Sequence, residues 1–336
     1  MHAPGAVGLP AASQALTNAE MKPRAQTVRV GDTDQAGGRT VVGLGELIWD
    51  LLPGGRTLGG APSNFAHHAR LLGDRAVVAS RVGEDELGRE ALGRLARAGV
   101  AADYVQTDPE HPTGTVAVEI DAGGEARFTV NPGSAWDYIE LTPRWAELAR
   151  VADAVCFGTL GQRHPRARST IHGFLALTRP DSLRLFDVNL RHSFFTAEML
   201  AASLRLASVV KFNSDELSAA AGMLGLRASR EAELSRLLID SYGLDLVAIT
   251  RGAGGSLLVS GDEAVEHHGY SVRVADTIGC GDAFAAALAH CLLDGLSLDE
   301  AGAAANRMGA WVATRAGATP EAAPGTIDEL LDGRKR

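Results

Sequence analysis

Residues 276–288 read DTIGCGDAFAAAL, so that two glycines and an acid stand directly before an apolar run. Glycines at this place predict a tight backbone turn, and the apolar run predicts that the turn leads into a buried helix. The first N–H groups of a helix have no partner within it, and the helix dipole adds a partial positive charge there. The stretch therefore predicts an anion-binding site at the start of a helix.

Asp282, the last polar residue of that stretch, has two interpretations. Aspartate is favoured at a helix start because its carboxylate caps free N–H groups, so the residue alone is more typical of a cap than of a catalytic base. A cap, however, needs neither the two flanking glycines nor the preceding Asp276-Thr277 pair. The whole string therefore favours a functional site.

Outward from this stretch, short apolar runs alternate with longer segments at helical spacing. The runs rich in branched residues predict strands at 41–48, 76–82, 154–157, 183–188, 208–212, 246–250 and 256–259. One helix is predicted over 61–72, with Pro62 near its start and Gly73 as its stop, and another over 87–95 ends at Gly99. This alternation is typical of an α/β fold in which helices cover a parallel sheet.

The region 113–130 breaks this rhythm. Apolar residues alternate over 113–120, the pair Gly123-Gly124 predicts a turn, and a second strand follows over 125–130. An antiparallel hairpin within a βα series does not fit inside a parallel core, so we expect it to project as an edge or a lid.

Composition excludes several classes of function. The chain of 336 residues has a net charge of −9 and no cluster of basic residues, which argues against nucleic acid and anionic membranes as partners. No apolar run approaches the roughly 20 residues of a membrane span. Cys156, Cys280 and Cys291 form no Cys-x-x-Cys pair, so the sequence supports neither disulfides nor structural zinc and indicates the cytoplasm. Residues 1–38 lack periodicity and are interpreted as a flexible tail.

Lysine occurs only as Lys22, Lys211 and Lys335, and none of these ends a P-loop of the form Gly-x-x-x-x-Gly-Lys. If the chain handles ATP, backbone amides, arginines and metal must hold the phosphates. No Gly-x-Gly-x-x-Gly follows a predicted strand, which argues against a dinucleotide-dependent oxidoreductase.

A second glycine-rich segment, GGAPSN at 59–64, lies between the strand that carries Glu46 and the first predicted helix. Paired glycines let a small polar ligand approach the backbone. Asp50 and Asn64 stand where they can accept and donate hydrogen bonds to hydroxyl groups. The segment alone is equally consistent with a tight turn.

Four segments, in one order and at one spacing, resemble the PfkB/ribokinase-like sugar kinases: GGAPSN at 59–64, NSDE at 213–216, TRGAGG at 250–255 and DTIGCGD at 276–282. The resemblance spans about 41–320. It implies a three-layer α/β/α core with a mostly parallel central sheet, and a small lid of strands from about 49–59 and 102–134. The sugar kinase domain would occupy 39–330. The stretches 45–53, 157–163 and 186–191 look most like bacterial fructokinases.

The resemblance implies that Asp282 is the general base for the sugar hydroxyl and that Gly279, Cys280 and Gly281 form an anion hole for the transferred phosphoryl group. Phosphoryl transfer is mostly positioning and charge stabilisation, which N–H groups at a helix start and one carboxylate can supply. The family usually has alanine where this chain has Cys280, at a position that acts through its backbone.

On the nucleotide side, Asn213 and Glu216 match the family's Asn-x-x-Glu element, which implies that they hold the ATP phosphates and, through water, Mg²⁺. The same pair also fits a helix start with a capping box. The resemblance adds further nucleotide contacts, with the last at the adenine: Thr250, Gly252, Gly255 and Asn306. It also implies a monovalent cation such as K⁺, held mainly by backbone oxygens of Asp276, Ile278, Arg315 and Gly317.

On the sugar side, the resemblance places Asp50, Gly60 and Asn64 against the hydroxyls. The fructokinase-like stretches add four residues: Arg163, Asp187, Asn189 and Arg191. The two arginines leave two substrates open, because fructose is neutral whereas an arginine would hold the carboxylate of 2-keto-3-deoxygluconate. We expect D-fructose, phosphorylated to fructose 6-phosphate; the keto acid, ribose, nucleosides and sugar phosphates are the alternatives.

In this resemblance the hairpin at 113–130 becomes a lid that closes over the substrate and excludes water. Such lids often pair two subunits, so a homodimer through the lid is expected. A catalytically silent sugar-binding protein is the alternative from another class. The intact Asp282 and its glycines argue against it.

Overall fold

The computed structural model describes residues 38–52, 54–120, 126–190 and 194–332. The strands of these segments form two sheets. The larger sheet has nine strands in the order β13-β12-β11-β10-β9-β8-β1-β4-β5. Pairs that involve β12 or β13 are antiparallel, and the other pairs are parallel, which confirms the expected mostly parallel sheet. Its strands are β1 (Thr40–Leu44), β4 (Arg75–Gly83), β5 (Val105–Asp108), β8 (Ala154–Gly158), β9 (Leu183–Asp187), β10 (Val209–Asn213), β11 (Leu246–Thr250), β12 (Ser256–Ser260) and β13 (Ala264–His267).

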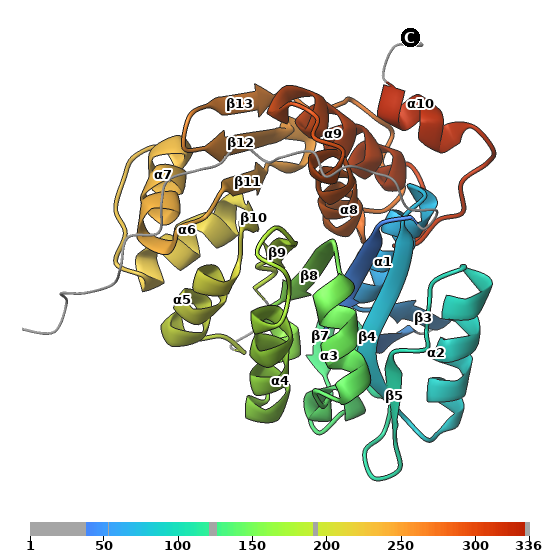
Figure 1. Ribbon diagram of the computed structural model, residues 1–336. Helices are drawn as coiled ribbons and strands as arrows, with labels where there is room; N and C mark the ends of the chain where they lie inside the picture. The colour runs from blue at the N-terminus through green and yellow to red at the C-terminus, as the bar shows by residue number, and fades with distance from the viewer. Residues whose placement is uncertain (1–37, 53, 121–125, 191–193, 333–336) are drawn as a thin grey trace, which may run out of the picture.

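Helices cover both faces of this sheet and give the expected three layers. Buried side chains of α1, α2, α8 and α9 pack on one face, and those of α3 to α7 pack on the other. Figure 1 shows α3, α4 and α5 side by side under the arc of strands. The helices are α1 (Ala61–Leu71), α2 (Glu86–Arg97), α3 (Pro143–Val151), α4 (Pro165–Ala176), α5 (Ala197–Leu206), α6 (Ser214–Met223), α7 (Glu231–Tyr242), α8 (Cys280–Leu293), α9 (Leu298–Ala313) and α10 (Thr326–Asp332).

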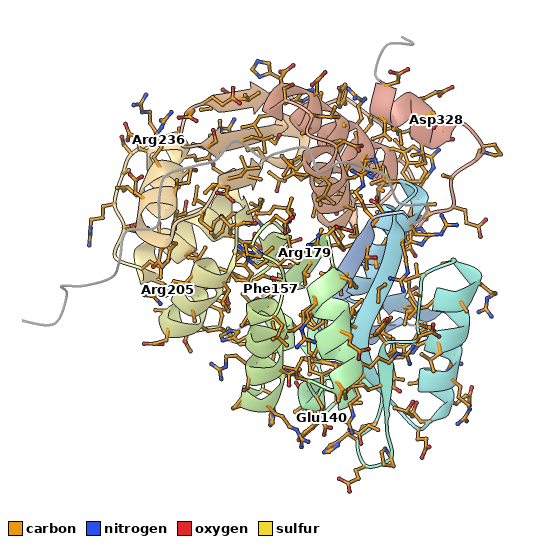
Figure 2. The ribbon with its side chains drawn as sticks, in the orientation of Figure 1. Glu140, Phe157, Arg179, Arg205, Arg236 and Asp328 are labelled. Carbon is orange, nitrogen blue, oxygen red and sulfur yellow. The ribbon has the colours of Figure 1, made fainter. Side chains whose placement is uncertain are left out.

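Side chains of each strand alternate between the two helical layers. Val41 faces the layer of α1 and α8, whereas its neighbour Val42 faces the layer of α3 to α7. In the second layer the rings of Phe157 and Phe186 stack at 5.1 Å between centroids. Figure 2 shows Phe157 inside the molecule and Arg236 at its periphery.

The strand prediction missed β13, and it is wrong at 41–48. The apolar run 41–48 forms two strands, β1 in the large sheet and β2 (Ile48–Leu52) in a separate small sheet. The chain bends between them at Gly45, whose φ of +145° is unfavourable for other residues. Gly45 and Glu46 interrupt the run at this place, but the period of its apolar residues alone does not divide one buried run into two strands.

The small sheet has the order β3-β2-β6-β7 and contains β3 (Gly55–Gly59), β6 (Gly114–Ile120) and β7 (Ala126–Val130). The predicted hairpin is confirmed as the antiparallel pair of β6 and β7, outside the parallel core. Its predicted turn at Gly123-Gly124 lies outside the described residues. The segment 102–134 contributes to both sheets, because β5 pairs with β4 at the edge of the large sheet.

The residues interpreted as a flexible tail lie outside the described part of the chain, except for Gly38. Within the described part, no helix has the length and apolar character that crossing a bilayer would require.

Candidate active site

A cavity of about 1020 Å³ opens at the carboxyl ends of the parallel strands, the edge at which α/β proteins bind ligands. The starts of α1, α6 and α8 line one side of it, and Ile48, Val116 and Val130 of the small sheet line the other. Six carboxylates line the cavity: Glu46, Asp50, Asp187, Glu216, Asp276 and Asp282. Among the lining residues that the structure describes, Lys211 is the one with a cationic side chain.

A second cavity, of about 610 Å³, lies over α6 and α7. It is lined by none of the residues that the sequence predicts for the site.

The start of α8 is built as the sequence predicts. Gly279 caps the helix with a left-handed φ of +79°, and a Cβ on it would lie 2.6 Å from Cα and O of Ala318. A residue with a side chain would therefore clash as well as strain the backbone. Gly279, Gly281 and Asp282 line the cavity, whereas Cys280 does not. The backbone N–H of Cys280 makes a long 3.4 Å bond to the Thr277 carbonyl.

The thiol of Cys280 is half-buried at this helix start. Burial, together with the nearby Asp276 and Asp282, raises the pKa of Cys280 to about 11. The thiol therefore stays protonated at neutral pH, which makes it a poor nucleophile.

Asn64 and Asp282 meet in the cavity although 218 positions separate them in the chain. The Asn64 Nδ2 donates to the Asp282 Oδ2 at 2.8 Å. Gly60 makes this approach possible, because α1 starts there with a φ of +106°, and a Cβ on Gly60 would lie 2.5 Å from the Glu46 carbonyl. Asp50, on β2, lines the same cavity.

Asn213 and Glu216 form the capping box that their spacing also suggested. Asn213 Oδ1 accepts from the Glu216 N–H, and Glu216 Oε2 accepts from the Asn213 N–H, each at 2.8 Å. Glu216 Oε1 accepts from the Leu190 N–H at 3.1 Å. Both residues also line the cavity, so the cap and a place in the site are compatible.

The remaining nucleotide-side residues divide into two groups. Thr250 lines the cavity, whereas Gly252, Gly255 and Asn306 are not among its lining residues. Asn306 is buried in α9, where its Nδ2 donates at 2.7 Å to Ser256 Oγ and to the Gly302 carbonyl. The Asn306 amide therefore links α9 to β12 through a hydrogen bond.

Asp276 joins the two segments assigned to a monovalent cation. Its Oδ1 accepts from the Ile278 N–H and its Oδ2 from the Gly317 N–H, both at 3.0 Å. These three residues line the cavity. Arg315 lies over the Trp311 ring at 4.5 Å and is not among the lining residues.

Arg163 does not reach the cavity. Its Nε and Nη2 donate to the two carboxylate oxygens of Asp137 at 2.8 Å, and Nη2 also donates to the Asn131 carbonyl at 2.6 Å. The guanidinium lies 4.1 Å from the Trp136 ring centre, and the ion pair is almost fully buried. Asp187 and Asn189 do line the cavity, and Arg191 lies outside the described residues.

Residues 53–324 match the pfkB family carbohydrate kinase model. The chain belongs to this family. The resemblance inferred from the four segments is thus confirmed, and the large, mostly parallel sheet agrees with it.

Curated and solved members of the family resemble this carbohydrate kinase over most of its length. The fructokinase of Escherichia coli is 31% identical over 277 residues, which cover 76% of this chain and 86% of that protein. A sugar kinase from Pyrococcus horikoshii in complex with ATP aligns with a TM-score of 0.73 at 27% identity, covering 88% of this chain and 97% of that one. Aminoimidazole riboside kinase from Salmonella enterica aligns with a TM-score of 0.73 at 26% identity, covering 87% and 99%.

Lys211 is one of the cavity residues of this kinase that sequence reasoning did not assign to the site, as is Glu46. Its Nζ lies 2.6 Å from Asp187 Oδ1, and both side chains are buried. Burial opposes the charge of Lys211, but Asp187, with Glu216 and Asp282, outweighs that effect and raises the pKa of Lys211. The available hints were its position two residues before Asn213 and the scarcity of lysine in the chain.

Proposed function

We propose that this carbohydrate kinase transfers the γ-phosphoryl group of ATP to a hydroxyl of D-fructose and forms fructose 6-phosphate. One observation carries the proposal. Asp282 stands at the start of α8, beside the Gly279–Gly281 turn, in the cavity that Asp50 also lines. Phosphoryl transfer to an alcohol requires a proton acceptor and an anion-binding group within one site.

In this mechanism Asp282 accepts the proton of the attacking hydroxyl. An alcohol is far less acidic than a carboxylic acid, so the proton moves late, as the bond to phosphorus forms. The hydrogen bond from Asn64 holds the carboxylate in one orientation. N–H groups of the Gly279–Gly281 turn, aided by the dipole of α8, stabilise the negative charge of the transferred group.

The cavity needs positive charge to accept ATP, because six carboxylates line it and, of the lining residues in the described part of the chain, Lys211 is the one that carries a cationic side chain. Oxygen donors of this kind suit Mg²⁺. Glu216 would hold the ion through water, since both of its carboxylate oxygens already accept backbone N–H groups. When bound, Mg²⁺ neutralises charge on the phosphates. K⁺ is proposed as a second cation, at backbone oxygens around Asp276 and Gly317.

The hydrogen bonds that Arg163 makes within the protein support fructose over 2-keto-3-deoxygluconate as the substrate. A carboxylate clamp needs a guanidinium that faces the cavity, and that of Arg163 instead donates to Asp137 and the Asn131 carbonyl. The resemblance to the fructokinase of Escherichia coli supports the same choice. The riboside kinase from Salmonella enterica makes ribosides the second substrate class to test.

The test is Mg²⁺-dependent release of ADP from ATP by the purified chain. D-fructose, 2-keto-3-deoxygluconate, ribose, a nucleoside and a no-sugar blank would be assayed in parallel, with the product identified by mass and NMR. Activity on fructose with phosphate at O6 supports the proposal. Turnover restricted to another of these acceptors would overturn the fructose assignment while leaving the kinase.

Asp282→Asn tests the base in the same assay, with Asp299→Asn as the matched control. Asp299 is an exposed acid in the first turn of α9 and does not line the cavity. We expect kcat to fall by about 10²–10⁴-fold for Asp282→Asn, as for the loss of a general base, and to remain unchanged for the control. Full activity of Asp282→Asn would remove Asp282 as the base.

We further infer that the enzyme acts in the cytoplasm as a homodimer through the small sheet. Leu51 on β2 is 38% exposed and offers an apolar contact on that sheet. Sedimentation should give twice the chain mass, and Leu51→Arg should shift it toward the monomer. A wild-type monomer at all concentrations would reject the dimer.

A further inference from the structure

Two adjacent histidines of α1, His67 and His68, reach a segment 250 residues away. His68 Nε2 lies 2.9 Å from the Ala318 carbonyl oxygen, and His67 Nε2 lies 3.2 Å from that of Pro320. The His68 side chain is fully buried. Because a carbonyl oxygen only accepts, the proton of the His68 ring must be on Nε2, which makes the imidazole the donor.

Ala318 in turn supports the turn that opens α8. Its Cα and O lie where a Cβ on Gly279 would be only 2.6 Å away, so the two backbones are in contact. The preceding N–H, of Gly317, donates to Asp276 at the start of the same turn. A shift of Ala318 would therefore move Gly279 and the N–H groups that follow it.

Asn64 and His68 are four residues apart in α1 and so lie on one face of the helix, one turn from each other. Asn64 holds the carboxylate of Asp282. His68 holds the segment that packs against Gly279. One face of α1 thus contacts both parts of the α8 start, the acid and the turn.

We propose that His68 is a positioning residue for phosphoryl transfer, which acts through Ala318 to fix the Gly279 turn against the transferred group. The proposal rests on the function proposed above, since it assigns the turn to the phosphoryl group. His68 moves no proton in this role. Burial, with His67 beside it, lowers the pKa of His68 to about 3, so the ring stays neutral at working pH.

The experiment compares His68→Leu, which fills the space without a donor, with His68→Gln, whose amide can still donate to the Ala318 carbonyl. We expect kcat to fall by about 10²-fold for His68→Leu, because small misplacement of reacting groups has effects of that size. Glutamine should restore kcat to within a few-fold. KM for the sugar should stay near the wild-type value in both, because His68 itself does not line the cavity.

His290→Leu is the matched control. His290 is a buried histidine near the other end of α8, and its Nδ1 lies 2.9 Å from Asp74 Oδ2, just beyond the end of α1. Its removal breaks another buried histidine contact, between α8 and the segment that follows α1, and neither His290 nor Asp74 lines the cavity. Thermal stability should fall while kcat stays unchanged, which separates positioning from general loosening.

Hydrogen exchange at the Gly317 amide gives a readout that does not depend on turnover. Exchange should accelerate in His68→Leu and not in His68→Gln or His290→Leu. The proposal would be overturned if His68→Leu kept the wild-type kcat and the wild-type exchange rate at Gly317. It would also be overturned if the leucine and glutamine variants lost kcat equally.

If His68→Leu does not fold, His68→Asn replaces it. Its shorter amide stops short of the carbonyl, so the same loss relative to His68→Gln is expected. If the wild type shows no kinase activity but the Gly317 amide exchanges faster in the variant, the proposed function is rejected. The contact between His68 and Ala318 then remains as a structural link.

Discussion

At the scale of single residues, Lys211 supplies a positive charge among the carboxylates that line the cavity. Its ammonium pairs with Asp187, and a Cβ on Gly281 at the start of α8 would lie 3.4 Å from Nζ. The group stays charged because Asp187, Glu216 and Asp282 outweigh the effect of burial. A fixed cation at this place suits an anionic ligand at the helix start.

Lys211→Met should lower both stability and activity. It leaves the Asp187 carboxylate buried without its cation, and breaking such a pair costs about 3–5 kcal/mol of unfolding free energy. The kcat/KM for ATP should fall as well, because the cation no longer faces the phosphates. Urea unfolding and steady-state kinetics measure the two effects.

The double variant Lys211→Met, Asp187→Leu is the control for that prediction. Removing both charges should recover most of the stability, since buried pairs are often replaced by apolar residues without loss. It should not recover activity. A double variant with wild-type kcat/KM would show that the pair has no role in the reaction.

His68 makes stability depend on pH in a definite direction. Burial lowers the folded-state pKa from 6.5 to about 3, so the unfolded chain takes up the proton first as pH falls. The stabilising contribution is therefore complete above pH 6.5 and is lost as pH falls toward 3, by about 1.4 kcal/mol per pH unit. His67, the neighbouring titratable group, is shifted downward by burial too and adds to this slope.

Urea unfolding of wild type and His68→Gln between pH 8 and pH 4 measures that contribution. The wild-type free energy should fall more steeply with acid than that of the variant, and the two slopes should agree above pH 7. Parallel curves throughout would contradict the assignment of a neutral, buried His68.

At the scale of secondary-structure elements, Arg163 joins the base of the small sheet to the core. It follows β8 and binds Asp137 in the 3-10 turn Ala135–Tyr138, and the carbonyl of Asn131 just after β7. Trp136, under its guanidinium, packs with Ile48, Val116 and Leu160, which also line the cavity. The arginine therefore ties the segment that follows β7 of the small sheet to the core.

Arg163→Met should destabilise the fold by about 3–5 kcal/mol, because Asp137 then remains buried without its partner. KM for the sugar should rise more than KM for ATP, since the small sheet lines the part of the cavity proposed for the sugar. Arg166→Met is the control, because Arg166 makes an exposed pair with Glu140 worth about 0–1 kcal/mol. Equal stability of the two variants would contradict this account.

At the scale of the whole molecule, residues of both sheets line the cavity, and segments of the two sheets alternate along the chain. Asp187 and Lys211 come from the large sheet, and Asp50 and Val116 come from the small one. The small sheet lies outside the large parallel sheet and packs through Trp49 and through the cluster that contains Ile48 and Val116. We expect it to be the element that moves when the sugar binds.

We expect fructose to slow hydrogen exchange at amides of β2 and β6 while leaving β9 to β11 unchanged. ATP hydrolysis without sugar should remain far below sugar phosphorylation, because an open cavity lacks the complete site. Exchange measured with and without fructose tests the first point. Equal protection of the large and small sheets would indicate general stabilisation instead of closure of a lid.

Local patterns along the chain were sufficient for most elements and for the glycine turn that starts α8. Helix starts, glycine stops and strand runs act over a few residues, so α1, α2 and the β6–β7 hairpin are found where the sequence predicts them. The division of 41–48 into β1 and β2 was not predicted, because the sequence does not show that β1 pairs with β4 and β8 whereas β2 pairs with β3 and β6.

The contacts within the cavity came only from the tertiary structure. Asn64 meets Asp282, His68 meets Ala318, and Lys211 meets Asp187, each through strand order and helix packing between distant segments. Arg163 illustrates the same point. Its residue type suited a carboxylate clamp for a substrate, but in the folded protein its guanidinium pairs with Asp137. Residue type shows what chemistry a side chain can perform, but packing between distant segments selects its partner.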